Sequence, residues 1–224
     1  MKLALVRSTE LFHLLEQHGP RLVQERFQVR ERSPQFATPH LAASLDVKFD
    51  SIYLACRFVH GYFCAGSQCP DGVADRVIEL SVQIMLEELG PNLWEHKLER
   101  CVDYGHTFSK IIEMVPGADI MHGEAVNVDG FFCLVLAKRR GMISQAVLDR
   151  VFAVMKNIGL PTIHESVELK SMVKALADAV EHRHGKQRVP LISGGIGSSA
   201  CVNDLDAKEL EGAIEELWAM HGDA

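Results

Sequence analysis

The sequence lacks several features that would each point to a particular class of protein. No uninterrupted apolar run is long enough for a membrane span, and Arg7 and Glu10 come too early for the apolar region of a signal peptide. Basic residues are not in excess, because 23 Lys and Arg face 30 Asp and Glu, for a net charge of −7. Neither nucleic acid nor an anionic membrane is therefore expected as the main partner.

Paired cysteines and a dinucleotide fingerprint are missing as well. The six cysteines contain no CxxC pair, and without an export signal reduced thiols are expected rather than disulfides. They are Cys56, Cys64, Cys69, Cys101, Cys133 and Cys201. No glycine-rich GxGxxG loop precedes a helix, and residues 194–197 (GGIG) are more typical of a hairpin turn. A soluble cytoplasmic protein is the expectation.

The apolar spacing predicts one mostly helical domain, for which 47% hydrophobic residues can supply the core. Ser8 or Thr9 is expected to cap a helix over 9–18 that Gly19-Pro20 ends, and a long helix is expected over 73–89 before a left-handed glycine cap at Gly90. Further helices are expected over 106–114, closed by Pro116-Gly117, over 122–140, from Ser144, from Ser166 and after Asp206. A strand over 188–193 completes a small β-hairpin. The predicted fold class is mainly α, with this hairpin near the C-terminus.

The segment 29–71 does not follow this pattern. It has no sustained apolar period, and it contains three prolines and half of the cysteines. Structureless loops of this length are uncommon inside compact domains. Two hypotheses are open: a lineage-specific loop, or translated non-coding sequence such as a retained intron.

A pair of histidines sixteen residues apart is the strongest chemical signal. His106 lies in the run VDYGHTFSK (102–110), and His122 begins the run HGEAV (122–126). Each histidine adjoins a glycine at the head of a segment with helical apolar spacing. Two imidazoles presented from neighbouring helix starts suit a divalent metal ion such as Zn²⁺. Taken alone, the same residues are also compatible with capping or core histidines.

The flanks of both histidines resemble the sugar phosphate cyclases, the superfamily of 3-dehydroquinate synthase, and are most similar to its 2-epi-5-epi-valiolone synthase branch. The similar stretches are 85–89, 91–95, 98–100, 102–109 and 122–126, with shorter ones at 2–6, 10–12, 190–197 and 203–205. Most of the chain outside about 29–71 takes part in the resemblance. The resemblance implies that residues 1–224 form the helical metal- and substrate-binding C-terminal domain of this fold, without its N-terminal NAD-binding domain.

The resemblance also implies roles for individual residues. His106 and His122 would bind Zn²⁺ or Co²⁺ with a glutamate that lies three residues before the lysine matching Lys2, and here that position precedes Met1. Lys2 and Asp103 match family positions that contact substrate. An aspartate at 103, where dehydroquinate synthases usually have asparagine, favours the valiolone-type branch. Without the resemblance, Lys2 is equally a frayed terminus and Asp103 a helix cap.

Four further residues are weaker candidates. Lys110 replaces the histidine or proline usual in the family, and it is a candidate acid/base group or phosphate donor. His182 matches a basic position on the substrate side. Arg100 and Lys186 are candidate substrate-binding residues. Each of them is also typical of a solvated surface.

The family reaction is a phosphate-eliminating lyase reaction on a sugar phosphate. Bound NAD⁺ transiently oxidises a hydroxyl, phosphate leaves, hydride returns, and an aldol step closes the carbocycle. For the valiolone-type branch the substrate is sedoheptulose 7-phosphate. The chain is expected to be incomplete or inactive in isolation, with a homodimer or a separate N-terminal half as partner. The alternatives are a non-catalytic helical module derived from this fold, or 3-dehydroquinate synthase itself.

Overall fold

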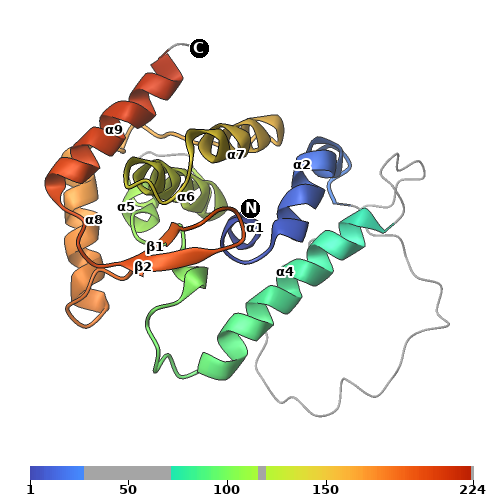
Figure 1. Ribbon diagram of the computed structural model, residues 1–224, viewed down its shortest axis with the longest axis horizontal. Coiled ribbons are helices and arrows are strands. Elements are labelled where there is room, and N and C mark those ends of the chain that lie inside the picture. The colour runs from blue at the N-terminus through green and yellow to red at the C-terminus, as the bar shows by residue number, and fades with distance from the viewer. Residues whose placement is uncertain (28–71, 116–119, 223–224) are drawn as a thin grey trace.

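Helix α6 (His122–Arg139) is the centre of the fold in the computed structural model, which describes residues 1–27, 72–115 and 120–222 (Figure 1). Every residue from Asn127 to Ala137 is buried. A helix that is apolar on all sides requires neighbours on all sides. Helix α6 accordingly contacts α5, α7, α9 and strand β1.

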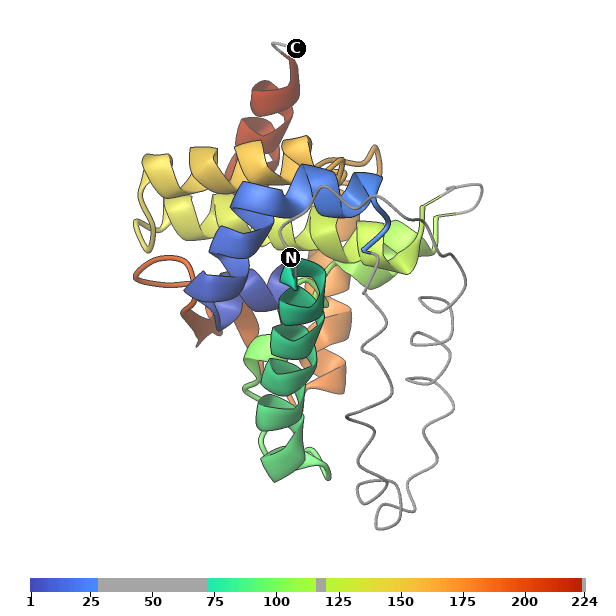
Figure 2. The same ribbon diagram turned by 90° about the vertical axis from the view of Figure 1, so that its right-hand side faces the viewer.

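The remaining elements surround α6. In Figure 1, α2 and α4 lie on one side of it and α8 and α9 on the other, while in Figure 2 α6 and α7 run side by side across the view. The bounds are α1 (Lys2–Val6), α2 (Thr9–Gln24), α4 (Val73–Leu89), the 3₁₀ turns η2 (Gly90–Asn92) and η3 (Cys101–Asp103), α5 (Ser109–Glu113), α7 (Gln145–Asn157), α8 (Leu169–His182), β1 (Val189–Ile192), β2 (Ser199–Val202) and α9 (Ala207–Gly222).

The hairpin of β1 and β2 contacts α1 and the start of α2, which lie far from it in the sequence. The strands are antiparallel, with Val189 opposite Val202, and all four β1 residues are buried. At the turn, the Gly197 N–H donates to the Leu5 carbonyl at 2.7 Å. Gly197 has a φ of +92°, and a Cβ there would lie 3.0 Å from Thr9 Cγ2. A glycine is therefore required where the turn approaches α1 and the start of α2.

The predicted fold class and several element bounds are confirmed. Helix α4 has the predicted bounds 73–89, and α6 ends one residue before the predicted 140. The Ser144 Oγ accepts the Val147 N–H at 3.4 Å, and the Asp206 Oδ1 accepts the Glu209 N–H at 2.8 Å. Both side chains cap their helices as predicted.

The predicted stop at Gly19-Pro20 of the helix over 9–18 is wrong. Helix α2 continues to Gln24 with Pro20 inside it. Leu22 continues the buried stripe of Leu11 and Leu15, and Gly19 faces Ile158 so closely that a Cβ would lie 2.4 Å from its Cγ2. Burial of this stripe thus outweighs the local helix-breaking tendency.

Three other boundaries differ from the sequence prediction. Helix α5 begins at Ser109, so His106 precedes it, and α8 begins at Leu169 because the Ser166 hydroxyl bonds to His164 Nδ1 at 2.8 Å instead of capping a helix. Gly90 has a right-handed conformation, with φ −54°, and continues into η2 rather than forming a left-handed cap. Pro116-Gly117 and the segment 29–71 lie outside the described residues.

Cys101, Cys133 and Cys201 are free thiols, in agreement with the prediction for this part of the chain. Cys56, Cys64 and Cys69 fall in the range that the structure does not describe. Within the described ranges, no helix combines the length and the apolarity needed to cross a membrane.

Replacing Gly130 by alanine should lower the free energy of unfolding by about 1–3 kcal/mol, because the new methyl group would overpack a rigid contact. Its Cβ would lie 2.9 Å from Cε1 of the fully buried Tyr104 ring. Gly123 in the same helix has no atom within 4 Å of a Cβ, so Gly123→Ala is the matched control and should cost nothing. Urea unfolding of both variants measures this difference. Equal midpoints would contradict close packing at Gly130.

Candidate functional site

A cavity of about 300 Å³ lies between α1, the segment before α5 and the first half of α6. Its lining includes Lys2 of α1, His106 of the preceding segment and His122 of α6, so three predicted site residues are brought together. Val126, Asn127, Met155 and Leu160 supply much of the remaining wall. The site is thus a partly apolar hollow with a few convergent polar groups, which is typical of small-molecule sites.

The segment 104–106 reaches the cavity because glycine allows it to lie directly on α6. Gly105 has a φ of +76°, and a Cβ there would lie 2.6 Å from the Val126 carbonyl oxygen. Next to it, the Tyr104 hydroxyl donates to the Gly130 carbonyl at 2.5 Å inside the core. These two contacts hold the backbone at Tyr104 and Gly105 against α6. His106 is consequently held near the start of α6, where His122 lies.

The two imidazoles face each other edge to face, with ring centroids 5.5 Å apart and an interplanar angle of 77°. His106 Nδ1 is 3.2 Å from the Tyr104 carbonyl oxygen, and His122 Nδ1 is 2.8 Å from Glu113 Oε2. Because a carbonyl and a carboxylate only accept, both Nδ1 atoms are assigned as the protonated nitrogens. Both Nε2 lone pairs are then free, which is the arrangement that metal-binding histidines require.

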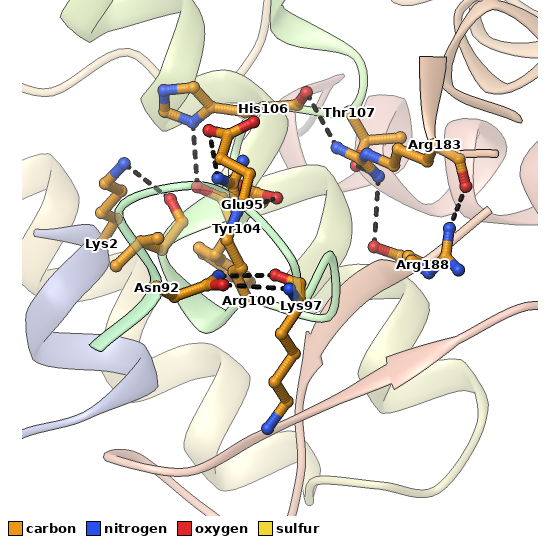
Figure 3. A network of polar contacts seen from close by, with 12 residues as sticks. Lys2, Asn92, Glu95, Lys97, Arg100, Tyr104, His106, Thr107, Arg183 and Arg188 are labelled. Carbon is orange, nitrogen blue, oxygen red and sulfur yellow. Dashed lines mark hydrogen bonds and ion pairs between the residues drawn. The ribbon is translucent and has the colours of Figure 1, made fainter. Parts of the chain in front are cut away.

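Lys2 provides the positive charge of the cavity. Its ammonium donates to the Val102 carbonyl at 2.8 Å (Figure 3). Burial lowers the pKa of Lys2, and the nearby Asp103 carboxylate opposes that shift. The pKa of His106 is lowered as well, mainly because the surrounding protein reduces its hydration and secondarily because Lys2 repels an imidazolium. The His106 side chain nevertheless remains open to solvent on the cavity side.

Asp103 and Arg100 form a fixed ion pair beside this cavity. Arg100 Nε and Nη2 donate to the two Asp103 oxygens at 3.1 and 2.9 Å. Its Nη1 donates to Glu95 Oε1 at 2.5 Å, and both of these residues are labelled in Figure 3. A bidentate contact of this kind orients the carboxylate in one plane. A phosphate approaching Arg100 would have to share its guanidinium with Glu95 and Asp103. The predicted substrate roles of both residues stay predictions.

Three other predicted residues lie on the surface. Lys110 is exposed in α5, His182 is exposed as the last residue of α8, and Lys186 is exposed in the turn that follows. None of the three belongs to the described lining of the cavity. The structure therefore does not bring them together with Lys2, His106 and His122, and their roles also stay predictions.

Arg183 is a residue that the sequence analysis missed. It follows His182, and its Nη2 donates to the His106 carbonyl at 3.3 Å while its Nη1 contacts Thr107 Oγ1 at 3.3 Å (Figure 3). The same nitrogen donates to the Gln187 and Arg188 carbonyls at 2.8 and 3.1 Å. Arg183 thereby connects α8 and the start of β1 to the segment carrying His106. Its only signal in the sequence is its place beside His182.

The two histidines fit a metal ion as a pair of nitrogen donors, but they do not make a complete ligand set. Across residues 1–27, 72–115 and 120–222, no cluster of three or more His, Cys, Asp or Glu side chains is arranged to hold a metal ion. Glu113 contacts His122 Nδ1, which gives it the position of an outer carboxylate that orients the ring. The chemistry of the donors suits Zn²⁺ or Co²⁺.

Comparison with known proteins relates these features to a family. The family model described as 3-dehydroquinate synthase C-terminal matches residues 66–180. A 2-epi-5-epi-valiolone synthase of Streptomyces albus is 41% identical over 224 residues, which is 100% of this chain and 45% of that protein. The enzyme of the same name from Actinoplanes is 43% identical over 213 residues, which is 95% of this chain and 44% of that protein.

A solved structure agrees with these similarities. ValA, the 2-epi-5-epi-valiolone synthase from Streptomyces hygroscopicus subsp. jinggangensis 5008 with NAD⁺ and Zn²⁺ bound, superposes with a TM-score of 0.77 at 39% identity. The match covers 98% of this chain and 49% of that one. The chain therefore spans about half the length of the proteins it resembles.

Arg183→Ala should reduce the free energy of unfolding by about 1–3 kcal/mol, because it removes charge-assisted hydrogen bonds to several carbonyls at once. The neighbouring exposed His182 provides the matched control, and His182→Ala should change stability by less than about 0.5 kcal/mol. Thermal and urea unfolding measure both. A neutral Arg183→Ala would show that these contacts do not hold the segment.

Proposed function

This chain belongs to the 3-dehydroquinate synthase C-terminal family, and from that premise we propose that it is the metal- and substrate-binding part of a 2-epi-5-epi-valiolone synthase-like sugar phosphate cyclase. The identity of about 40% to enzymes of that name supports the branch. The observation that carries the proposal is the His106–His122 pair on one cavity, whose Nδ1 atoms are both engaged and whose Nε2 atoms have no hydrogen bond from the part of the chain that the structure describes.

His106 and His122 would hold a Zn²⁺ or Co²⁺ ion through their Nε2 atoms. Such an ion, when bound, polarises substrate oxygens as a Lewis acid. Glu113 keeps His122 in the tautomer that leaves Nε2 unprotonated, and the Tyr104 carbonyl does the same for His106. The further ligands would come from substrate or from groups other than the described side chains.

Lys2 is proposed to bind the anionic or hydroxyl-bearing end of the substrate, because it brings an ammonium group to the lining of the cavity. Its half-buried position strengthens an interaction with phosphate relative to one in open solvent. The Asp103 carboxylate, held in one orientation by Arg100, is suited to accept hydrogen bonds from two sugar hydroxyls. From the family resemblance, Lys110 and His182 are proposed to have catalytic roles and Arg100 and Lys186 to bind substrate, from positions outside the described lining of the cavity.

The substrate class proposed is a seven-carbon ketose phosphate, with sedoheptulose 7-phosphate as the candidate. NAD⁺ would be bound by the part of such an enzyme that corresponds to the other half of the relatives. Residues 1–224 are accordingly proposed to form a single C-terminal domain.

Phosphate release from sedoheptulose 7-phosphate tests this function. The assay contains NAD⁺, Co²⁺ and the N-terminal part of the Streptomyces albus relative. Metal binding without any turnover would favour the non-catalytic module instead.

Titration with Co²⁺ should show one site whose visible absorption depends on both histidines. His106→Ala and His122→Ala should each weaken binding by more than about 100-fold, because each removes a direct nitrogen donor, beyond the roughly 10–100-fold loss for an outer-shell residue. His13, an exposed histidine of α2, provides the control variant His13→Ala, which should bind as the wild type does. Equal affinity in all three variants would refute the metal site.

Glu113→Gln should weaken Co²⁺ binding by about 10-fold, because a neutral amide is a poorer acceptor and permits the wrong tautomer of His122. The effect should appear in affinity rather than in stability, since Glu113 is exposed. Glu124→Gln is the matched control, because Glu124 Oε2 accepts the Met121 N–H at 2.9 Å and does not contact the imidazoles. A larger loss from Glu124→Gln would contradict the role given to Glu113.

A further inference from the structure

Asp129 is a fully buried carboxylate that the proposed site does not use. It lies in the middle of α6 with 0% exposure. Its Oδ2 accepts the backbone N–H groups of Phe108 and Ser109 at 2.5 and 2.8 Å, and its Oδ1 accepts the Cys133 thiol at 3.3 Å. Aspartate is rarely found fully buried unless it is paired, so these contacts require an explanation.

Helix α5 needs an acceptor at its start that its own sequence does not provide. It has five residues, and Phe108 at its N-cap position makes no side-chain cap. The first N–H groups of any helix lack partners within the helix. Asp129 supplies the missing acceptor from a different helix, and its negative charge suits a helix N-terminus. The segment directly after His106 is thereby attached to α6.

The same helix carries His122 seven residues earlier. Seven residues correspond to about two turns, or roughly 10 Å, so His122 and Asp129 lie on the same side of α6. Between them, Val126 packs on Gly105, and directly after Asp129 the Gly130 carbonyl accepts the Tyr104 hydroxyl. Helix α6 therefore presents one imidazole directly and holds the backbone of the other through Asp129.

Burying this carboxyl group has an electrostatic cost. Burial raises the pKa of Asp129, and this loss of hydration outweighs the opposing hydrogen bonds from the backbone N–H groups and Cys133. An apolar residue would fill a site needed only for packing at lower cost. The presence of a buried carboxyl acceptor at this place thus indicates that the N–H groups of Phe108 and Ser109 must be held in place.

We propose that Asp129 is a positioning residue, which fixes the segment following His106 on α6 and so sets the His106 imidazole against that of His122. One part of this proposal, the effect of Asp129 on the affinity for the ion, rests on the metal-binding function proposed above. The geometric part concerns the protein without metal and is tested separately.

The first experiment is metal-free and uses Asp129→Asn. The amide oxygen can still face the two N–H groups, but a neutral acceptor forms weaker bonds than a carboxylate. Amide hydrogen exchange at Phe108 and Ser109 should accelerate about fivefold, which corresponds to the loss of part of one hydrogen bond. Exchange at Leu134, two turns or less away in the buried helix, should not change. The nuclear Overhauser contact between the His106 and His122 rings should weaken. Unchanged exchange at Phe108 and Ser109 would overturn the proposal.

The second experiment measures Co²⁺ affinity in Asp129→Ala, Asp129→Asn and a control with equal loss of melting temperature. Leu148→Ala is that control, because Leu148 is fully buried in α7 and is not among the cavity-lining residues. Asp129→Ala should weaken Co²⁺ binding about tenfold or more, and Asp129→Asn should restore most of it. Equal affinity in Asp129→Ala and Leu148→Ala would reduce Asp129 to a structural residue and overturn the proposal.

The two experiments separate the possible failures. If the wild type binds no Co²⁺, the proposed function fails, but hydrogen exchange and the ring contact still decide the role of Asp129. If Asp129→Ala does not fold, Asp129→Asn alone decides it. If Co²⁺ binds but Asp129→Asn changes neither the hydrogen exchange at Phe108 and Ser109 nor the contact between the two rings, the metal site stands and the positioning role is wrong.

Discussion

The seating of the 104–109 segment on α6 is the contact on which the rest of the site depends. Gly105 lets the backbone of this segment touch the Val126 carbonyl of α6, and Gly130 of α6 leaves room for the Tyr104 ring. Each of the two elements thus contributes one glycine to the contact. Helix α6 is itself fixed because its neighbours bury it on all sides. A rigid central helix and a closely fitted segment together give the two imidazoles a defined separation without any ion between them.

Much of this fold could be predicted from the apolar residues, because α4 and α7 each bury a stripe that repeats along the sequence and α6 is apolar along most of its length. The ends of α2, α5 and α8 could not. Burial of Leu22 carries α2 through Pro20, and the His164–Ser166 contact delays the start of α8. These outcomes depend on partners distant in the sequence or on local side-chain contacts, and spacing alone does not contain them.

The candidate site, too, could be predicted only in part from the sequence. The sequence and its family resemblance brought Lys2, His106 and His122 together, and the structure places all three on one cavity. The Arg100–Asp103 pair, the contact of Glu113 with His122, and the links made by Arg183 are tertiary hydrogen bonds with no spacing signature. Family motifs select residues for their chemistry, whereas the groups that orient them are visible only when the chain is folded.

The contact between Gly197 and Leu5 makes the cavity depend on two segments that are far apart in the sequence. Lys2 belongs to a short helix whose end is tied to a hairpin near the opposite terminus. Such a tie closes a very long loop, and contacts of large sequence separation form late. The side of the cavity that carries Lys2 therefore reaches its final form only when a hairpin far along the sequence has paired. A change in the hairpin turn would thus be felt at Lys2, although no turn residue lines the cavity.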